Sequence, residues 1–267
     1  MKIVFLAILL CYSSSTIAQF TNTSEKKEPP TARQIIEADE YLKIEIKYGF
    51  FKLAWLELES IKDTVVNGDT LSYLRSVIRT NPRVPFLDEE IDNYSSLFYL
   101  DENNKPVTYN YWKDNVDEGK YREHDYFFDR ELNQVRFNEN GARDTLDLVD
   151  PATSGLIVFI WARMFAGTQT PYNMNVYVSK EKGEIHAENF TKIEKRKVIA
   201  FDDKEFDTYY SKGQAKINGP FGFSGNFEAW FLTDDLRIPV EARVKVFLGK
   251  VKIRLIEYKR GRKNEKN

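Results

Sequence analysis

The two histidines could act as acids, bases or metal ligands, and each lies close to acidic residues in the sequence. His124 stands between Glu123 and Asp125, and His186 stands two residues before Glu188. Imidazole and carboxylate groups are common ligands of Zn²⁺ and other transition metals. Adjacent residues of a strand point to opposite faces, so neither group chelates a metal by itself. The sequence leaves open whether the histidines meet in space. Solvated strand faces are the simpler interpretation, and we predict no metal site and no cofactor.

Two pairs of carboxylates have a spacing that acid–base chemistry uses. Glu57 and Glu59 point the same way from one predicted strand, but no partner across a cleft can be identified. Most such pairs lie on a wet strand face. Asp234 and Asp235 lack the alternating oxygen ligands of a calcium loop. A turn whose aspartates accept local amide hydrogen bonds is the favoured interpretation of this second pair.

Serine and thiol nucleophiles find no support in the sequence. Ser224 lies in a Gly-Phe-Ser-Gly run that has neither the spacing nor the strand-to-helix context of a nucleophile elbow. The glycines of residues 218–225 do not follow a phosphate-binding pattern. The only cysteine, Cys11, lies in a segment that we expect to be removed. We therefore predict no catalytic residue, and we predict that residues 218–225 connect two strands.

Aromatic side chains on neighbouring predicted strands leave two interpretations open. They either pack a core beneath a helix or line a cavity for an apolar or sugar ligand. Core packing is the default, and the ligand-binding residues stay unassigned. The residues concerned are Phe98, Tyr99, Tyr109, Tyr111, Trp112, Tyr126, Phe127 and Phe128.

Residues 1–18 have the pattern of a secretory signal peptide. Lys2 precedes an apolar run at 3–10, and a Thr-Ile-Ala sequence ends at Ala18, after which cleavage is expected. Two leucines precede Cys11, where a lipoprotein cleavage site would require a small residue. We predict an exported protein of the periplasm or outer envelope that is not a lipoprotein. The alternative is a buried N-terminal strand.

Composition predicts one domain and argues against some partners. The chain has 267 residues and a formal net charge of −2. A charge so close to neutral argues against a nucleic-acid partner. No segment after residue 18 approaches a transmembrane span. We predict a polar leader at 19–40, a single β-rich domain at 41–258 and a basic tail at 259–267. The oligomeric state is left open.

Alternating apolar and polar residues between turn clusters predict an all-β fold with an antiparallel, curved or barrel-like sheet. One apolar stretch is too long for a strand between hairpins. We predict one buried helix at 152–165, capped by Asp150 or Ser154 and ended by Gly167. The predicted strands are 43–48, 54–59, 71–80, 96–100, 107–112, 121–128, 134–138, 172–179, 184–192, 197–200, 206–217 and the strands of the closing segment.

The closing hairpin carries the sharpest register prediction. Apolar residues occupy every second position of 240–248 and of 251–255. A two-residue turn at 249–250 would place Leu248 opposite Val251 and would gather all of these apolar side chains on one face.

Four segments give the chain a resemblance to a known family. They are the hairpin at 48–54, the predicted helix with Arg163, the block at 230–240 and the turn at 249–251. On these segments the chain resembles the exported bacterial family called domain of unknown function 3108, over most of residues 41–258. The block at 230–240 is the specific part. The resemblance implies a β-rich domain of the periplasm or outer envelope, and it implies neither an activity nor functional residues.

Three hypotheses of function remain. The leading one is a non-enzymatic envelope protein that binds an apolar or glycolipid-like ligand, or a partner protein, within the curved sheet. The second is a hydrolase of envelope glycans or lipids that uses carboxylates such as Glu57 or Asp235. The third is a structural assembly factor of the envelope. An apolar cavity would favour the first, facing carboxylates in a polar cleft would favour the second, and a solid interior would favour the third.

Overall fold

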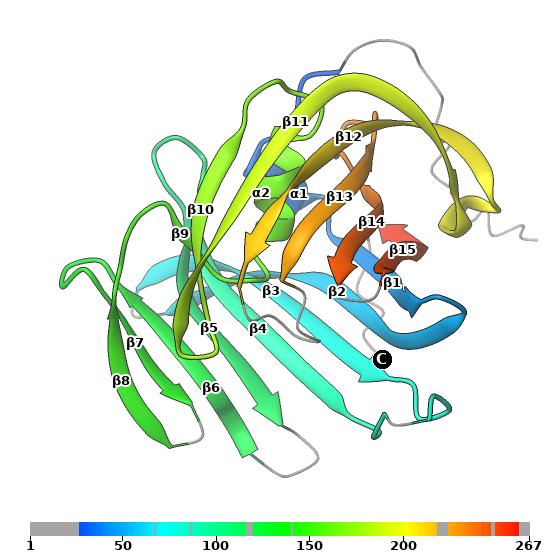
Figure 1. Cartoon of the computed structure of the whole chain (residues 1–267). Coiled ribbons are helices and arrows are strands. Elements are labelled where there is room, and N and C mark those ends of the chain that lie inside the picture. Colours follow the sequence, from blue (N-terminus) through cyan, green and yellow to red (C-terminus); the bar gives the residue numbers. More distant parts are fainter. Residues whose placement is uncertain are drawn as a thin grey trace, which may run out of the picture.

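A computed structural model of the chain describes residues 27–66, 68–85, 87–115, 120–139, 141–217, 224–246 and 249–261. Fifteen strands of this part form one sheet, accompanied by two α-helices and one short 3₁₀ helix (Figure 1). The helices are α1 (Ala32–Glu37), α2 (Val158–Phe165) and η1 (Ile199–Phe201). The first eight strands are β1 (Glu40–Tyr48), β2 (Phe51–Val66), β3 (Asp69–Thr80), β4 (Ile91–Leu100), β5 (Pro106–Asn115), β6 (Lys120–Asp129), β7 (Gln134–Glu139) and β8 (Ala142–Asp147). The others are β9 (Ala152–Thr153), β10 (Tyr172–Val178), β11 (Glu181–Val198), β12 (Lys204–Lys216), β13 (Gly225–Leu232), β14 (Pro239–Val246) and β15 (Gly249–Arg260).

Most strands pair with their neighbours in the chain. The sheet runs from β8 through β1, continues from β1 to β15, and then runs back through β14 to β9. All of these pairs are antiparallel except the short parallel pair of β9 and β10. The predicted fold class, an all-β protein with a large antiparallel curved sheet, is therefore confirmed. The pairing of β1 with β15 joins the two halves of the chain.

The sheet curls until one edge meets its own inner face. Edge strand β9 and the residue after it pack on β4 and β5 through buried hydroxyl groups: Ser154 Oγ lies 3.0 Å from Ser96 Oγ, and the backbone N–H of Ser154 donates to Thr108 Oγ1 at 3.1 Å. Strands β6 to β8 continue beyond this contact (Figure 1). The sheet therefore closes by packing its edge strand β9 on its own inner face, and this contact encloses the concave side of the sheet.

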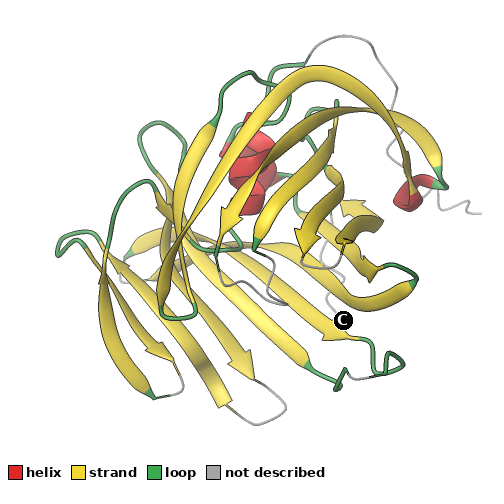
Figure 2. Cartoon of the chain, in the orientation of Figure 1, coloured by secondary structure: helices red, strands yellow, loops and turns green. Residues whose placement is uncertain are grey.

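Helix α2 lies on that concave side, beneath the arch of β10 to β13 (Figure 2). The predicted start at residue 152 is wrong, because Asp150 Oδ1 accepts from the N–H of Ala152 and Ser154 bonds to Ser96. Neither side chain is left to cap the helix, which begins after Ile157 with no side-chain cap. Gly167 follows the helix with φ +75°, as predicted for its end. Neither helix of the described part is long and apolar enough to cross a bilayer.

Four other elements differ from prediction. The strands predicted at 184–192 and 197–200 are one long strand, β11, which a bulge between Asn189 and Ile193 bends, and its end runs into η1. Strands β8 and β9 had no predicted counterpart; β8 is a solvent-exposed edge strand and β9 has only two residues. Helix α1 lies inside the segment predicted as a polar leader, where Thr31 and Gln34 form a capping box.

The closing hairpin has the predicted face but a different register. Val244 lies opposite Val251 and Ala242 opposite Ile253, so the strands are shifted by an even number of residues from the predicted pairing. An even shift keeps every apolar side chain on the same face, because the side-chain period of a strand is two. The predicted pairing of Leu248 with Val251 involves a residue outside the described part.

One buried arginine fastens α2 to the sheet. Arg163 donates from Nη1 and Nη2 to the two carboxylate oxygens of Glu40 on β1, at 2.7 and 3.0 Å, and from Nε to the carbonyl of Leu236 at 2.8 Å. Tyr258 of β15 donates its hydroxyl to the same carboxylate at 2.6 Å. Arg163 is 4% exposed and Glu40 is 3% exposed. A bidentate pair removed from water holds its geometry strictly, because either charge alone would be costly to bury.

Asp234, in the turn after β13, completes this buried polar cluster. Its Oδ1 accepts from the N–H of Ile238 at 3.2 Å, and its Oδ2, fully shielded from solvent, accepts no hydrogen bond from the described residues. The residue as a whole is partly exposed, but its carboxyl group is not. Burial raises the pKa of Asp234 to about 6, against the opposing effect of the Arg163 charge.

We expect Arg163→Met to lower the free energy of unfolding by about 3–5 kcal/mol, because it leaves Glu40 buried without its partner. Urea unfolding followed by circular dichroism measures this. Arg33→Met is the matched control, since Arg33 makes an exposed pair with Glu37 at 4.0 Å, and we expect a change within about 0.5 kcal/mol. Equal effects of the two substitutions would contradict the anchoring role.

The raised pKa of Asp234 predicts a pH dependence. The folded protein binds this proton more tightly than the unfolded chain, so the contribution of Asp234 to stability falls as pH rises from about 4 to about 6. Asp234→Asn removes the decline and keeps the acceptor for Ile238. We expect the variant to gain on the order of 1–3 kcal/mol relative to the unaltered protein between pH 4 and pH 7, from urea midpoints at each pH. A difference that does not vary with pH would refute this.

Gly213 on β12 leaves no room for a side chain. A Cβ there would lie 2.1 Å from the carbonyl oxygen of His186 and 2.6 Å from the Phe227 ring. We expect Gly213→Ala to destabilise the fold by about 1–3 kcal/mol. Gly155→Ala is the control, because a Cβ at Gly155 meets nothing within 4 Å. Thermal unfolding of both variants tests the prediction, which fails if Gly213→Ala is as stable as Gly155→Ala.

Candidate functional site

A cavity of about 330 Å³ lies on the concave side of the sheet, bounded by α2 and by inward-facing residues of most strands. Nearly all of its lining is hydrocarbon. The strands from β1 to β5 contribute Ile46, Leu56, Ser76, Ile78, Tyr94 and Tyr111. The helix and the residues before it contribute Gly155, Leu156, Val158, Phe159 and Ala162. The strands from β10 to β15 contribute Tyr172, Val176, Val178, Ile185, Asn189, Ser211, Ala215, Ile217, Phe227, Ala229, Phe231, Ala242, Val244 and Ile253. We call this space the apolar cavity.

Small residues keep the apolar cavity open. Ala229 of β13 lies directly opposite Ala242 of β14, and Ala242 lies opposite Ile253 of β15. Ala162 faces the same space from helix α2. Larger side chains at these positions would fill the volume, so the cavity follows from residue size at a few inward positions of an otherwise packed interior.

One fully buried hydroxyl of the lining has no hydrogen-bond partner among the described residues. Ser211 and Asn189 satisfy each other, with Ser211 Oγ 2.7 Å from Asn189 Oδ1. Ser76 is 1% exposed, and its Oγ makes no hydrogen bond to any described residue. A buried hydroxyl of this kind is costly unless something bonds to it. A polar atom of a bound molecule would meet this need.

A smaller pocket of about 140 Å³ adjoins the apolar cavity. The two share Tyr94, Tyr111 and Val178 in their linings, and Lys113, His124, Tyr126 and Ser179 complete the smaller one. We call it the side pocket. Strand register explains its composition: Tyr94, Lys113 and His124 form one rung across β4, β5 and β6, and Tyr111 pairs with Tyr126 in another. All of these side chains lie on the inner face of the sheet.

The ionisable groups of the side pocket are paired. Lys113 Nζ lies 2.9 Å from Asp92 Oδ1, and His124 Nδ1 lies 3.3 Å from Glu139 Oε1. Tyr126 donates its hydroxyl to Glu139 and accepts from the N–H of Lys180. Burial, followed by the bond to Glu139, raises the pKa of Tyr126, which keeps the phenol protonated as a donor.

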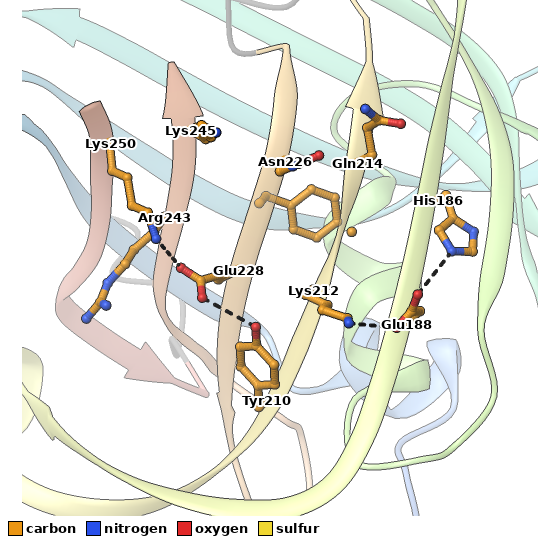
Figure 3. Close-up of a pocket in the computed structure, with 12 residues that line it drawn as sticks. His186, Glu188, Tyr210, Lys212, Gln214, Asn226, Glu228, Arg243, Lys245 and Lys250 are labelled. Atoms are coloured by element: carbon orange, nitrogen blue, oxygen red, sulfur yellow. Dashed lines mark hydrogen bonds and ion pairs between the residues drawn. The ribbon is translucent and has the colours of Figure 1, made fainter. Parts of the chain in front are cut away.

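A third concavity, of about 550 Å³, lies on the opposite face of β11 to β15 (Figure 3). Residues that alternate with the lining of the apolar cavity form it, among them His186 and Glu188 of β11 and Arg243 and Lys245 of β14. We call it the outer groove. Phe227 borders both spaces. The outer groove is therefore lined mainly by polar and charged side chains and the apolar cavity by hydrocarbon, as expected for the two faces of one sheet.

Most of the charge in the outer groove is internally balanced. Glu188 lies 3.2 Å from Lys212 Nζ. Glu228 accepts from Lys250 at 2.8 Å and from the Tyr210 hydroxyl at 3.4 Å (Figure 3). The hydrogen bond from Lys250 lowers the pKa of Glu228. The ion pairs of the outer groove stabilise the outer face of these strands.

The two histidines do not meet. His124 lies in the side pocket on β6, whereas His186 lies on the outer face of β11, where Nδ1 is 2.6 Å from Asn173 Oδ1 and Nε2 is 3.8 Å from Glu188. Within the described ranges, no group of three or more His, Cys, Asp or Glu residues could hold a metal ion.

The carboxylates considered for acid–base chemistry are engaged in ion pairs. Glu57 lies 3.0 Å from Lys43, and Glu59 lies 3.8 Å from Arg75. Asp235 lies 3.1 Å from Arg260, while Asp234 belongs to the buried cluster around Arg163. None of these four carboxylates lines the apolar cavity or the side pocket.

Some of the aromatic residues singled out in the sequence pack in hydrophobic cores, and Tyr111 lines the apolar cavity. Phe98, Tyr126 and Phe128 are buried in the main core. Tyr111 is stacked on Tyr94 at 6.1 Å and lines the apolar cavity. Trp112 lies in a second cluster on the outer face, stacked on Tyr73 at 5.8 Å, with Tyr99 and Tyr109 packed nearby. Phe127 contacts Tyr109 edge to face.

Sequence reasoning missed Lys113, Tyr94 and the unpaired Ser76. Lys113 stands two residues after Tyr111 but one residue beyond the strand predicted at 107–112, and nothing in the sequence marks that face as concave. It also missed Glu40, the partner of Arg163. A lone arginine in an apolar helical segment was the available signal, because such a charge requires a partner.

Comparisons with known proteins yield similar folds at low identity. No family model matches the sequence, and no curated protein matches it. A β-barrel-like protein of domain of unknown function DUF1849 from Brucella abortus is 10% identical with a TM-score of 0.44, over 84% of this chain and 96% of that one. A protein from Bacteroides fragilis, assigned as exported and with a YmcC-like fold, is 9% identical with a TM-score of 0.40, over 87% and 98%. A protein from Parabacteroides distasonis, assigned as a lipoprotein, is 9% identical with a TM-score of 0.38, over 83% and 95%.

Proposed function

We propose that this protein is a non-enzymatic binding module that holds an apolar or glycolipid-like ligand in the apolar cavity. The observation that carries the proposal is the cavity itself, whose volume of about 330 Å³ is lined almost entirely by hydrocarbon side chains. Ligand sites of proteins are typically concave, mostly apolar spaces with a few polar groups, and this volume falls within their usual range.

The volume indicates the size of the ligand. At about 30 Å³ for each group the size of a water molecule, the cavity holds roughly eleven methylene-sized groups. Each methylene transferred from water contributes about 0.8 kcal/mol. A single acyl or alkyl chain of about twelve carbons therefore fits, and its transfer supplies enough free energy for binding at micromolar concentrations or below.

The proposed setting is the cell envelope. The signal-peptide pattern of residues 1–18 supports export, and the periplasm or outer envelope is the destination that we propose. A binding protein there would shield an apolar chain from water. The two other hypotheses gain no support, because the carboxylates considered for a hydrolase lie in ion pairs outside the cavity, and the interior is not solid.

Filling the cavity tests this function. We expect Ala229→Leu to reduce affinity for the uncharged fluorescent probe N-phenyl-1-naphthylamine at least tenfold, since the larger side chain occupies the space where the probe would bind. Ala142→Leu is the matched control: it makes the same change at an exposed position of β8, and we expect its affinity to stay within twofold. Fluorescence titration measures both. Equal probe affinity in the unaltered protein and in Ala229→Leu would overturn the proposed function.

A further inference from the structure

We propose that the ligand is an uncharged single-chain amphiphile of the monoacylglycerol type, with its chain in the apolar cavity and its hydroxyl-bearing headgroup in the side pocket. The inference rests on the proposed function of the apolar cavity and adds the chemistry of the other end of the ligand.

The apolar cavity and the side pocket share three lining residues. Tyr94, Tyr111 and Val178 border both. The rings of Tyr94 and Tyr111 are nearly parallel, with an interplanar angle of 6°, and their stack forms the boundary between hydrocarbon and polar surroundings. A molecule that crosses this boundary must have an apolar part on one side and a polar part on the other.

The charged groups at the side pocket favour an uncharged headgroup. Lys113 is paired with Asp92, and His124 faces Glu139. An anionic headgroup would approach the carboxylates of both pairs, and a cationic headgroup would approach Lys113. Introducing a further charge beside the partly buried groups of Lys113, Asp92 and Glu139 is unfavourable, whereas a hydroxyl or ester group adds hydrogen bonds without adding charge.

Hydrogen-bonding atoms remain for such a headgroup. A lysine ammonium has three donors, and the contact of Lys113 with Asp92 uses one of them. Nδ1 of His124 faces Glu139, which leaves Nε2 as the second hydrogen-bonding atom of the ring. The Ser76 hydroxyl supplies one further unsatisfied group in the lining of the apolar cavity, where an ester or hydroxyl oxygen of the ligand would meet it.

Size limits the headgroup to about that of glycerol. The side pocket holds about 140 Å³, or roughly five groups of the size of a water molecule. Covalently bonded atoms lie closer together than neighbouring waters, so the six heavy atoms of glycerol fit this space. A disaccharide would not.

Three ligands with twelve-carbon chains test the inference below their micelle concentrations, by displacement of N-phenyl-1-naphthylamine. They are 1-monolauroylglycerol, which is uncharged, laurate, which is anionic, and dodecyltrimethylammonium, which is cationic. We expect monolauroylglycerol to bind at least tenfold more tightly than the other two. Equal or tighter binding of either charged ligand, or displacement by none of the three, would overturn the inference.

Two histidine variants separate the headgroup from the chain. We expect His124→Leu to weaken monolauroylglycerol at least fivefold and to leave probe affinity within twofold, because the side pocket changes and the apolar cavity does not. His186→Leu makes the same change in the outer groove and is expected to alter neither. Equal monolauroylglycerol affinity in the two variants would overturn the headgroup assignment, while the effect of Ala229→Leu on the probe would still decide the proposed function separately.

Discussion

The buried pair of Arg163 and Glu40 is the interaction on which the interior of this protein depends. A curved sheet alone would leave its concave side open or would collapse on itself, and helix α2 prevents both. The helix carries hydrocarbon toward the cavity from Phe159 and Ala162, while Arg163, one residue further on, anchors it to β1 and to the turn after β13. The bond of the guanidinium to the Leu236 carbonyl ties these three parts of the chain at one point. Because an unpaired charge there would be costly, the helix has one favourable position.

Closure of the sheet contributes the second constraint. Strand β9 does not pair with the opposite edge of the sheet but packs on the inner face of β4 and β5 through buried serine and threonine hydroxyls. This arrangement places β6 beside the β10–β11 turn, where Tyr126 accepts from the backbone of Lys180. The side pocket therefore exists because the sheet closes edge on face. Its residues come from β4, β5 and β6 on one side and from the end of β10 on the other.

Periodicity in the sequence predicted the fold class well and the interior poorly. Alternation identified most of the strands and the correct face of the closing hairpin, because a period of two survives an even error in register, as in the pairing of Val244 with Val251. The start of α2 was missed because Asp150 and Ser154, good helix caps by residue type, bond elsewhere in the folded chain. The cavity depends on which strands face each other across the concave side. Local sequence does not mark Ala229 and Ala242 as residues that line a cavity, nor does it mark Lys113 and His124 as neighbours.

Native mass spectrometry of the protein, produced in a bacterial host and purified without detergent, tests most directly whether the interior binds a ligand. We expect a bound species whose mass corresponds to an uncharged single-chain amphiphile, in a one-to-one complex that is lost in Ala229→Leu and retained in Ala142→Leu. A spectrum with only the bare protein mass, unchanged by added monolauroylglycerol or N-phenyl-1-naphthylamine, would contradict a ligand-binding interior.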